Sequence, residues 1–213
     1  MSNKSSKTTP SQVWGPFYVQ HAPFRCRLAP IGALGTPLII KGQVRSVDGS
    51  PLCGIVIDLW QASGVQSDDT TGGVYDYYEP DGKKHEYKEQ LNQHGAAKEY
   101  AFRARLLTSP TDGTYELHTV MPSAYFDPDD GLWRCPHIHF FVQPNTTITK
   151  SNGQFDDLVT QLYFKGASPY NDTDKHILPE LTIETEKQKR TREDGTVFEY
   201  LQGQFDIVLE KKK

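Results

Sequence analysis

The stretch that most constrains this chain is residues 134–142, which read Arg-Cys-Pro-His-Ile-His-Phe-Phe-Val. After the proline, every residue except two histidines is apolar or aromatic, which indicates a strand buried on at least one face. Strand side chains alternate between faces, so His137 and His139 point the same way, about 7 Å apart along the strand. The pair can supply two ligands of a metal site, although two half-buried histidines bonded to backbone would give the same pattern.

Short segments of alternating hydrophobicity surround this strand and predict a β-protein. From Leu38, apolar residues alternate with Lys41, Gln43 and Arg45 up to a turn at residues 48–51, as expected for a strand with one solvated face. Helical periodicity is scarce, and Gly, Pro and Asp punctuate the chain. We therefore expect an all-β fold, a single antiparallel β-sandwich domain with long loops and little helix. Further strands are expected at residues 55–60, 101–107, 114–121, 158–164, 197–201 and 204–209.

The length of 213 residues suits one core. We expect a polar, partly disordered N-terminal arm at residues 1–14 and one domain at residues 15–210. The loops at residues 61–100 and 122–133 are long for a sandwich, which favours a functional role for both. Residues 184–193 are interpreted as a solvated charge run.

Composition excludes several classes of function. The net charge is −4 and Lys and Arg cluster only at residues 211–213, which argues against nucleic acid as a partner. No apolar run matches a signal peptide or a spanning helix, so we expect no membrane association and a cytoplasmic protein. Three scattered cysteines, Cys26, Cys53 and Cys135, predict no disulfide framework. Cys135 is interpreted as a buried, inert thiol.

Two tyrosines in the long loops can complete a site with the histidines. Tyr75 lies in the first long loop and Tyr125 in the second. Phenolate oxygen is a hard, anionic donor that suits ferric iron, whereas zinc would recruit Cys, His or carboxylate. Fe(III) with two phenolates and one hydroxide is neutral, so such a cluster can be buried without the desolvation cost of a net charge.

Four segments carry a resemblance to a known family. They are Gly-Pro-Phe-Tyr at 15–18, Asp-Leu-Trp-Gln-Ala at 58–62 with Gly-Val-Tyr at 73–75, Pro-Ser-Ala-Tyr at 122–125 leading to residues 134–140, and Thr-Gln-Leu-Tyr-Phe at 160–164. With these motifs the chain resembles the intradiol ring-cleavage dioxygenases, the family of catechol 1,2-dioxygenase and protocatechuate 3,4-dioxygenase.

The resemblance implies a cofactor and a set of site residues. The cofactor is one non-haem Fe(III) per chain, and the implied metal ligands are Tyr75, Tyr125, His137 and His139. Arg134 and Gln161 fall on the family's active-site arginine and glutamine. Tyr125 is also implied as catalytic, because it leaves the metal when substrate binds and carries away a proton. Candidate substrate contacts are Tyr18, Tyr77 and Phe126.

The implied reaction is cleavage of a catechol-type ring between its two hydroxylated carbons, with both atoms of O2 incorporated and a cis,cis-muconate-type product. The partners are then a catechol-type small molecule and O2, and homo-oligomerisation is left open.

Two other classes of function compete with this interpretation. One is a non-catalytic β-sandwich module that binds ligands through its tyrosine-rich loops. The other is a different His-based non-haem metalloenzyme, in which a carboxylate of Asp127, Asp129 or Asp130 joins the histidines and favours ferrous iron. The same carboxylates offer Arg134 a purely structural salt bridge.

Overall fold

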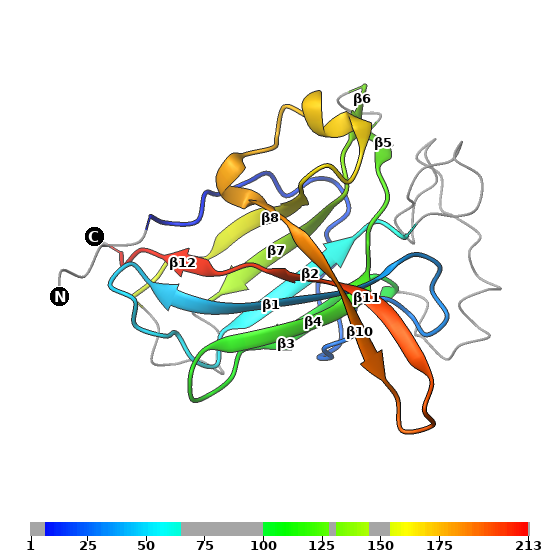
Figure 1. The fold of residues 1–213 in the computed structure, drawn as a ribbon. Coiled ribbons are helices and arrows are strands. Elements are labelled where there is room, and N and C mark those ends of the chain that lie inside the picture. Colours follow the sequence, from blue (N-terminus) through cyan, green and yellow to red (C-terminus); the bar gives the residue numbers. More distant parts are fainter. Residues whose placement is uncertain (1–6, 65–99, 128–130, 145–153, 213) are drawn as a thin grey trace.

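The computed structural model describes residues 7–64, 100–127, 131–144 and 154–212. Within these ranges the chain forms two five-stranded sheets that face each other, a small hairpin and two 3-10 turns (Figure 1). The prediction of an all-β sandwich with little helix is confirmed. No helix in this part of the chain has the length and hydrophobicity needed to cross a bilayer.

The strands divide between the sheets as follows. The first sheet contains β1 (Pro37–Ser46), β4 (Thr114–Val120), β10 (Thr185–Thr191), β11 (Val197–Gln204) and β12 (Ile207–Leu209). The second has the order β3 (Arg103–Leu107), β2 (Val56–Gln61), β7 (His137–Gln143), β8 (Leu158–Phe164) and β9 (Thr182–Ile183). The hairpin joins β5 (Tyr125–Asp127) to β6 (Leu132–Arg134), and the 3-10 turns are η3 (Pro169–Asp172) and η4 (Pro179–Leu181).

The pairing within the sheets is mixed, where an antiparallel sandwich was expected. Most pairs are antiparallel, but β1 runs parallel to β11 and β12, and β8 runs parallel to β9. Parallel neighbours need a long crossover. Here β2, β3, β4, β7 and β8 all come between β1 and β11 in the sequence, so the chain is long enough to return and pair with β1 in parallel.

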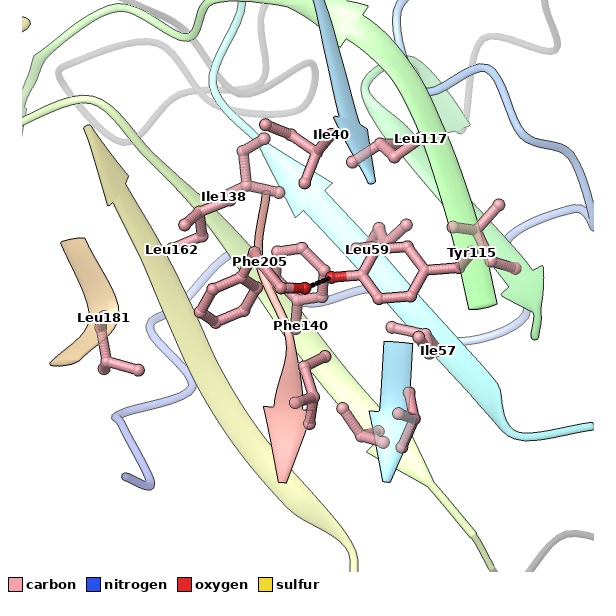
Figure 2. Close-up of a cluster of buried hydrophobic side chains, with 14 of the residues drawn as sticks. Ile40, Ile57, Leu59, Tyr115, Leu117, Ile138, Phe140, Leu162, Leu181 and Phe205 are labelled. Atoms are coloured by element: carbon pink, nitrogen blue, oxygen red, sulfur yellow. Dashed lines mark hydrogen bonds between the residues drawn. The ribbon is translucent and has the colours of Figure 1, made fainter. Parts of the chain in front are cut away.

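The core lies between the two sheets (Figure 2). Ile40 and Leu117 of the first sheet and Ile138 and Phe140 of the second are fully buried. Burying a side chain of this size contributes about 1.5–3 kcal/mol. Because Ile138 and Phe140 face this core, the alternating histidines of β7 point to the outer face of the second sheet.

One polar group inside this core is satisfied by the backbone between β11 and β12. The hydroxyl of Tyr115 donates to the backbone carbonyl of Phe205 at 2.6 Å, drawn as the dashed line in Figure 2. Burial raises the pKa of Tyr115 well above its ordinary value. The phenol therefore stays neutral and supports the core.

The outer face of the second sheet is covered by the N-terminal segment. The amide of Gln12 donates to the carbonyl of Val159 at 2.8 Å, and the hydroxyl of Thr160 donates to the carbonyl of Pro10 at 2.8 Å. The segment therefore pairs with the open part of β8, which β9 does not reach. Residues 1–6 lie outside the described ranges, so partial disorder of the arm at residues 1–14 stays a prediction.

The charged run at residues 184–193 is solvated, as predicted, but most of it also forms a strand that the sequence analysis did not expect. β10 pairs along its length with β11, and Lys189 forms an ion pair with Glu199 across the hairpin at 2.8 Å. The turn contains Gly195 at φ +82°, a conformation that suits glycine. The run is exposed, as expected.

Candidate active site

Cross-strand register brings the histidines together with residues from two neighbouring strands. His139 lies opposite Trp60 of β2 and opposite Gln161 of β8, and His137 lies opposite Tyr163. Residues directly opposite in a ladder share a face of the sheet. All five side chains are almost completely buried, at 0–2% exposure. The outer face of the second sheet therefore carries a closed polar and aromatic cluster.

The two histidines direct their ring nitrogens toward each other. Their Nε2 atoms lie 3.1 Å apart. Nδ1 of His137 lies 2.7 Å from the carbonyl of Cys135. Because a carbonyl can only accept, this Nδ1 carries the hydrogen, and Nε2 of His137 keeps a lone pair. Two of the four predicted ligand atoms, the Nε2 atoms of His137 and His139, thus lie close together.

Both imidazoles are neutral at physiological pH. Burial, followed by the positive charge of Arg134, lowers the pKa of His137. Burial and the neighbouring His137 lower the pKa of His139 well below its ordinary value. A neutral imidazole nitrogen is the form that binds a metal.

His139 is held differently from His137. Its Nδ1 is buried and has no hydrogen-bond partner among the described residues. Its ring stacks on Trp60, with centroids 4.6 Å apart and planes 9° apart. Trp14 of the N-terminal segment also stacks on Trp60, at 6.0 Å. Aromatic packing therefore fixes the ring of His139.

Tyr125 is the one predicted tyrosine ligand that the described ranges contain. It begins β5, is 5% exposed, and its ring centroid lies 5.6 Å from that of His137. Phe17 packs against its ring at 5.8 Å. Tyr75 and Tyr77 lie outside the described residues. The described donors, two neutral imidazoles and a buried phenol, fit a hard, highly charged ion such as ferric iron.

Arg134 is buried beside this cluster. Its Nε donates to Asp174 at 3.0 Å, and its Nη2 donates to Oε1 of Gln161 at 2.9 Å. Burial alone would lower the pKa of Arg134, but nearby Tyr125 and Asp174 outweigh burial and raise it above its ordinary value. The arginine is a fixed, permanent cation.

The salt bridge considered between Arg134 and Asp127 exists, with 4.0 Å between Nη1 and the carboxylate. A closer partner, which the sequence did not suggest, is Asp174 at 3.0 Å from Nε. Asp129 and Asp130 lie outside the described residues. No short-range pattern connects positions 134 and 174, so sequence reasoning missed Asp174.

Gln161 is oriented by three neighbours. Its Oε1 accepts from Arg134 and, at 2.6 Å, from the hydroxyl of Tyr163. Its Nε2 donates to the carbonyl of Val13 at 2.9 Å. The amide therefore links the arginine to the N-terminal segment. Tyr163 was not assigned a role from the sequence, although it lies two residues from Gln161 on the same strand face.

Two of the three candidate substrate contacts, Tyr18 and Phe126, lie within the described residues. Tyr18 packs on Trp60 at 4.9 Å, and its hydroxyl donates to Asp58 at 2.7 Å. Burial, followed by this bond, raises the pKa of Tyr18. Phe126 is 39% exposed and packs on Trp133, on the other side of the hairpin strand from Tyr125. Both remain predictions.

Cys135 is fully buried, and burial raises the pKa of its thiol. A thiolate is therefore disfavoured there, as expected for an inert cysteine.

In the part of the chain that the structure describes, no third His, Cys, Asp or Glu joins the two histidines as a metal-binding group. The described residues thus offer no support for a histidine and carboxylate centre.

Comparisons with known proteins place the chain in a family of dioxygenases. A family model described as Dioxygenase matches residues 13–211. The 6-chlorohydroxyquinol 1,2-dioxygenase of Cupriavidus pinatubonensis is 30% identical, over 80% of this chain and 55% of its own length. A chlorocatechol 1,2-dioxygenase of Pseudomonas putida is 28% identical, over 98% of this chain and 70% of its own length.

Solved structures show the same fold. The dioxygenase domain of a dioxygenase and carbohydrate-binding protein fusion from Streptomyces sp. SirexAA-E is 30% identical, with a TM-score of 0.62 over 96% of this chain and 99% of that one. Hydroxyquinol 1,2-dioxygenase from Pseudomonas putida DLL-E4 has a TM-score of 0.70 at 23% identity, covering 98% of this chain and 68% of that one.

The fold is an all-β sandwich in which a buried histidine pair lies near a buried phenol and a buried arginine. The match along almost the whole chain makes the assignment specific: the chain belongs to the intradiol dioxygenase family. It spans 55% and 63% of the length of the first two curated relatives.

Proposed function

We propose that this chain is an Fe(III)-dependent intradiol dioxygenase. It cleaves a catechol-type ring between its two hydroxylated carbons with O2 and gives a cis,cis-muconate-type product. The observation that carries the proposal is the pair of Nε2 atoms 3.1 Å apart, beside Tyr125 and Arg134 on one buried face. The names of the relatives support catechol-type substrates.

The residues that would hold the iron are His137, His139, Tyr125 and Tyr75. Two neutral imidazoles and two phenolates give a donor set of charge −2, which together with one hydroxide balances a trivalent ion. When bound, Fe(III) draws electron density from a coordinated catecholate, so that the ring rather than a reduced metal reacts with O2. Arg134 does not disturb this balance, because its own charge is paired with Asp174.

Tyr125 would act as ligand and base. The phenol lies beside His137 and near Arg134, whose positive charge favours the phenolate. A phenolate released from the metal can take one of the two catechol hydroxyl protons. The tyrosine would thus take one of the two protons, and the hydroxide that completes the charge balance would take the other.

Arg134 and Gln161 would stabilise charge that grows on the ring. Their side chains are joined by a 2.9 Å hydrogen bond, and both are buried. Fixed donors in a site that excludes water typically supply about 3–4 kcal/mol of transition-state stabilisation. The surrounding aromatic side chains keep water out.

The test is an oxygen-uptake assay over a panel of catechols, with identification of the products. We expect one O2 consumed per catechol and a product opened between the hydroxylated carbons. His139→Ala should abolish this activity. His118→Ala, on β4 of the other sheet, is the matched control and should keep it. Cleavage beside the hydroxylated carbons, or no uptake by iron-loaded protein with any catechol, would refute the proposal.

A further inference from the structure

Asp174 is a buried carboxylate whose contacts reach beyond Arg134. It follows η3 on the chain, and its side chain is fully buried. Oδ1 accepts from the backbone N–H of His176 at 3.0 Å, which fixes the carboxylate to its own turn. The other oxygen points to the segment that precedes β7.

That oxygen, Oδ2, binds two consecutive residues. It accepts from Nε of Arg134 at 3.0 Å and from the backbone N–H of Cys135 at 3.0 Å. The first bond sets the direction of the guanidinium, whose Nη2 then meets Gln161. The second bond anchors the main chain two residues before the first candidate metal ligand.

The anchored main chain in turn holds that ligand. The carbonyl of Cys135 accepts from Nδ1 of His137 at 2.7 Å. Pro136 lies between them, and its ring restricts rotation of this short connection. A proline also restricts the backbone angles of the residue before it, here Cys135, so the Cys135 carbonyl has little freedom to turn relative to the Cys135 amide. A partner on Nδ1 fixes both the tautomer and the orientation of a metal-binding histidine.

A carboxylate that only neutralised Arg134 would not need the amide of Cys135. The guanidinium offers further donors, and Nη1 lies 4.0 Å from a second carboxylate, Asp127. The bond to the Cys135 amide instead adds a link from the carboxylate to His137. The two roles make different predictions for variants.

We propose that Asp174 is the positioning residue of the candidate metal centre, directing His137 through the backbone of Cys135 and directing Arg134 toward Gln161. The predicted effect of Asp174 on metal binding rests on the proposed function. The predicted effect of Asp174 on the His137 ring does not, because the hydrogen bonds between Asp174 and Cys135 and between His137 and Cys135 form without a metal.

The first experiment compares iron affinity among variants of the full chain. Each protein is titrated with ferrous iron under argon and then exposed to air. Asp174→Ala should bind iron about 10- to 100-fold more weakly, as is typical when the partner of a metal ligand is removed. Asp172→Ala, an exposed aspartate of the same turn, is the matched control and should bind as the parent does.

A double variant separates positioning from charge balance. Arg134→Gln with Asp174→Ala removes both charges, so it should fold even where the single Asp174 variant does not. If Asp174 positions His137, the double variant still binds iron weakly, while Arg134→Gln alone binds within a few-fold of the parent. Parent-like iron affinity in the double variant would mean that Asp174 only neutralises Arg134, and would overturn the proposal.

The second experiment needs no metal. Nitrogen-15 NMR of the metal-free protein should show His137 as a single Nδ1–H tautomer in the parent and as a mixture in the double variant. An unchanged single tautomer would contradict the proposal. If the parent shows the tautomer but binds no iron, the proposed function fails while the positioning role stands.

Discussion

The indole of Trp60 lies parallel to the imidazole of His139, with ring centroids 4.6 Å apart. His137 is held instead by a hydrogen bond to the carbonyl of Cys135. The two candidate ligands are therefore oriented by different forces. Loss of an aromatic surface should affect one ligand, and loss of a hydrogen-bond partner should affect the other.

Trp60→Leu should weaken iron binding by about 10-fold, because the ring of His139 loses its stacking surface while its Nδ1 gains no described partner. Trp60→Phe keeps an aromatic face and should bind iron nearly as the parent does. Anaerobic iron titration measures both, and thermal unfolding reports any loss of packing separately. Equal iron affinities in the two variants would show that stacking does not orient His139.

The two tyrosine ligands should behave differently. Tyr125→Phe should keep some iron and colour but lose much activity, because this residue is the one expected to leave the metal with a proton. Tyr75→Phe should remove the charge-transfer band that persists in the substrate complex. Visible spectra of both variants with and without catechol decide the matter, and identical spectra would contradict this division of roles.

Arg134→Gln should reduce both turnover and stability. Turnover per bound iron should fall roughly 100-fold, since a fixed donor at the developing charge is lost. The free energy of unfolding should fall by about 3–5 kcal/mol, because Asp174 is left buried without its cation. Steady-state kinetics normalised to iron and urea unfolding measure the two effects. Turnover per iron within a few-fold of the parent would remove Arg134 from the catalytic set.

The Asp174 carboxylate should make stability depend on pH in acid. Burial pushes the pKa of Asp174 upward, but Arg134 and the backbone N–H of His176 outweigh burial and hold it below its ordinary value. A lowered folded-state pKa stabilises the fold at every pH above the unfolded value of about 3.9, and the stabilisation is lost as the pH falls through the folded value.

The control is Asp174→Asn, which does not titrate. The difference in unfolding free energy between parent and variant should be constant from pH 7 down to about 5 and should shrink below about pH 4. Urea unfolding at several pH values measures it. A difference that stays the same at pH 3 would show that the pKa of Asp174 is not lowered in the folded protein.

Local sequence patterns predicted the parts of the site that depend on one strand. His137 and His139 alternate with Ile138 and Phe140, so their common face could be predicted from period two alone. The hairpin that places Tyr125 opposite Arg134 was not predicted, because residues 122–133 were interpreted as a loop. The strands of this hairpin are three residues long, too short to show an alternating pattern.

Contacts between distant segments could not be predicted in that way. Asp174 is 40 residues from Arg134, and nothing in the sequence marks it among many aspartates. The parallel pairing of β1 with β11 likewise joins two segments far apart in the sequence, so no local pattern predicts it. The exposed strand β10 was missed because it lacks alternating hydrophobicity, although Asp194-Gly195 is a hairpin signal that was available.

The iron content and visible spectrum of the purified protein test the central claim most directly. After expression with adequate iron, we expect about one iron per chain and a coloured protein without added reductant, because phenolate-to-Fe(III) charge transfer absorbs visible light. His137→Ala should lose both, and His118→Ala should keep both. A colourless protein that takes up zinc in preference to iron would contradict the account.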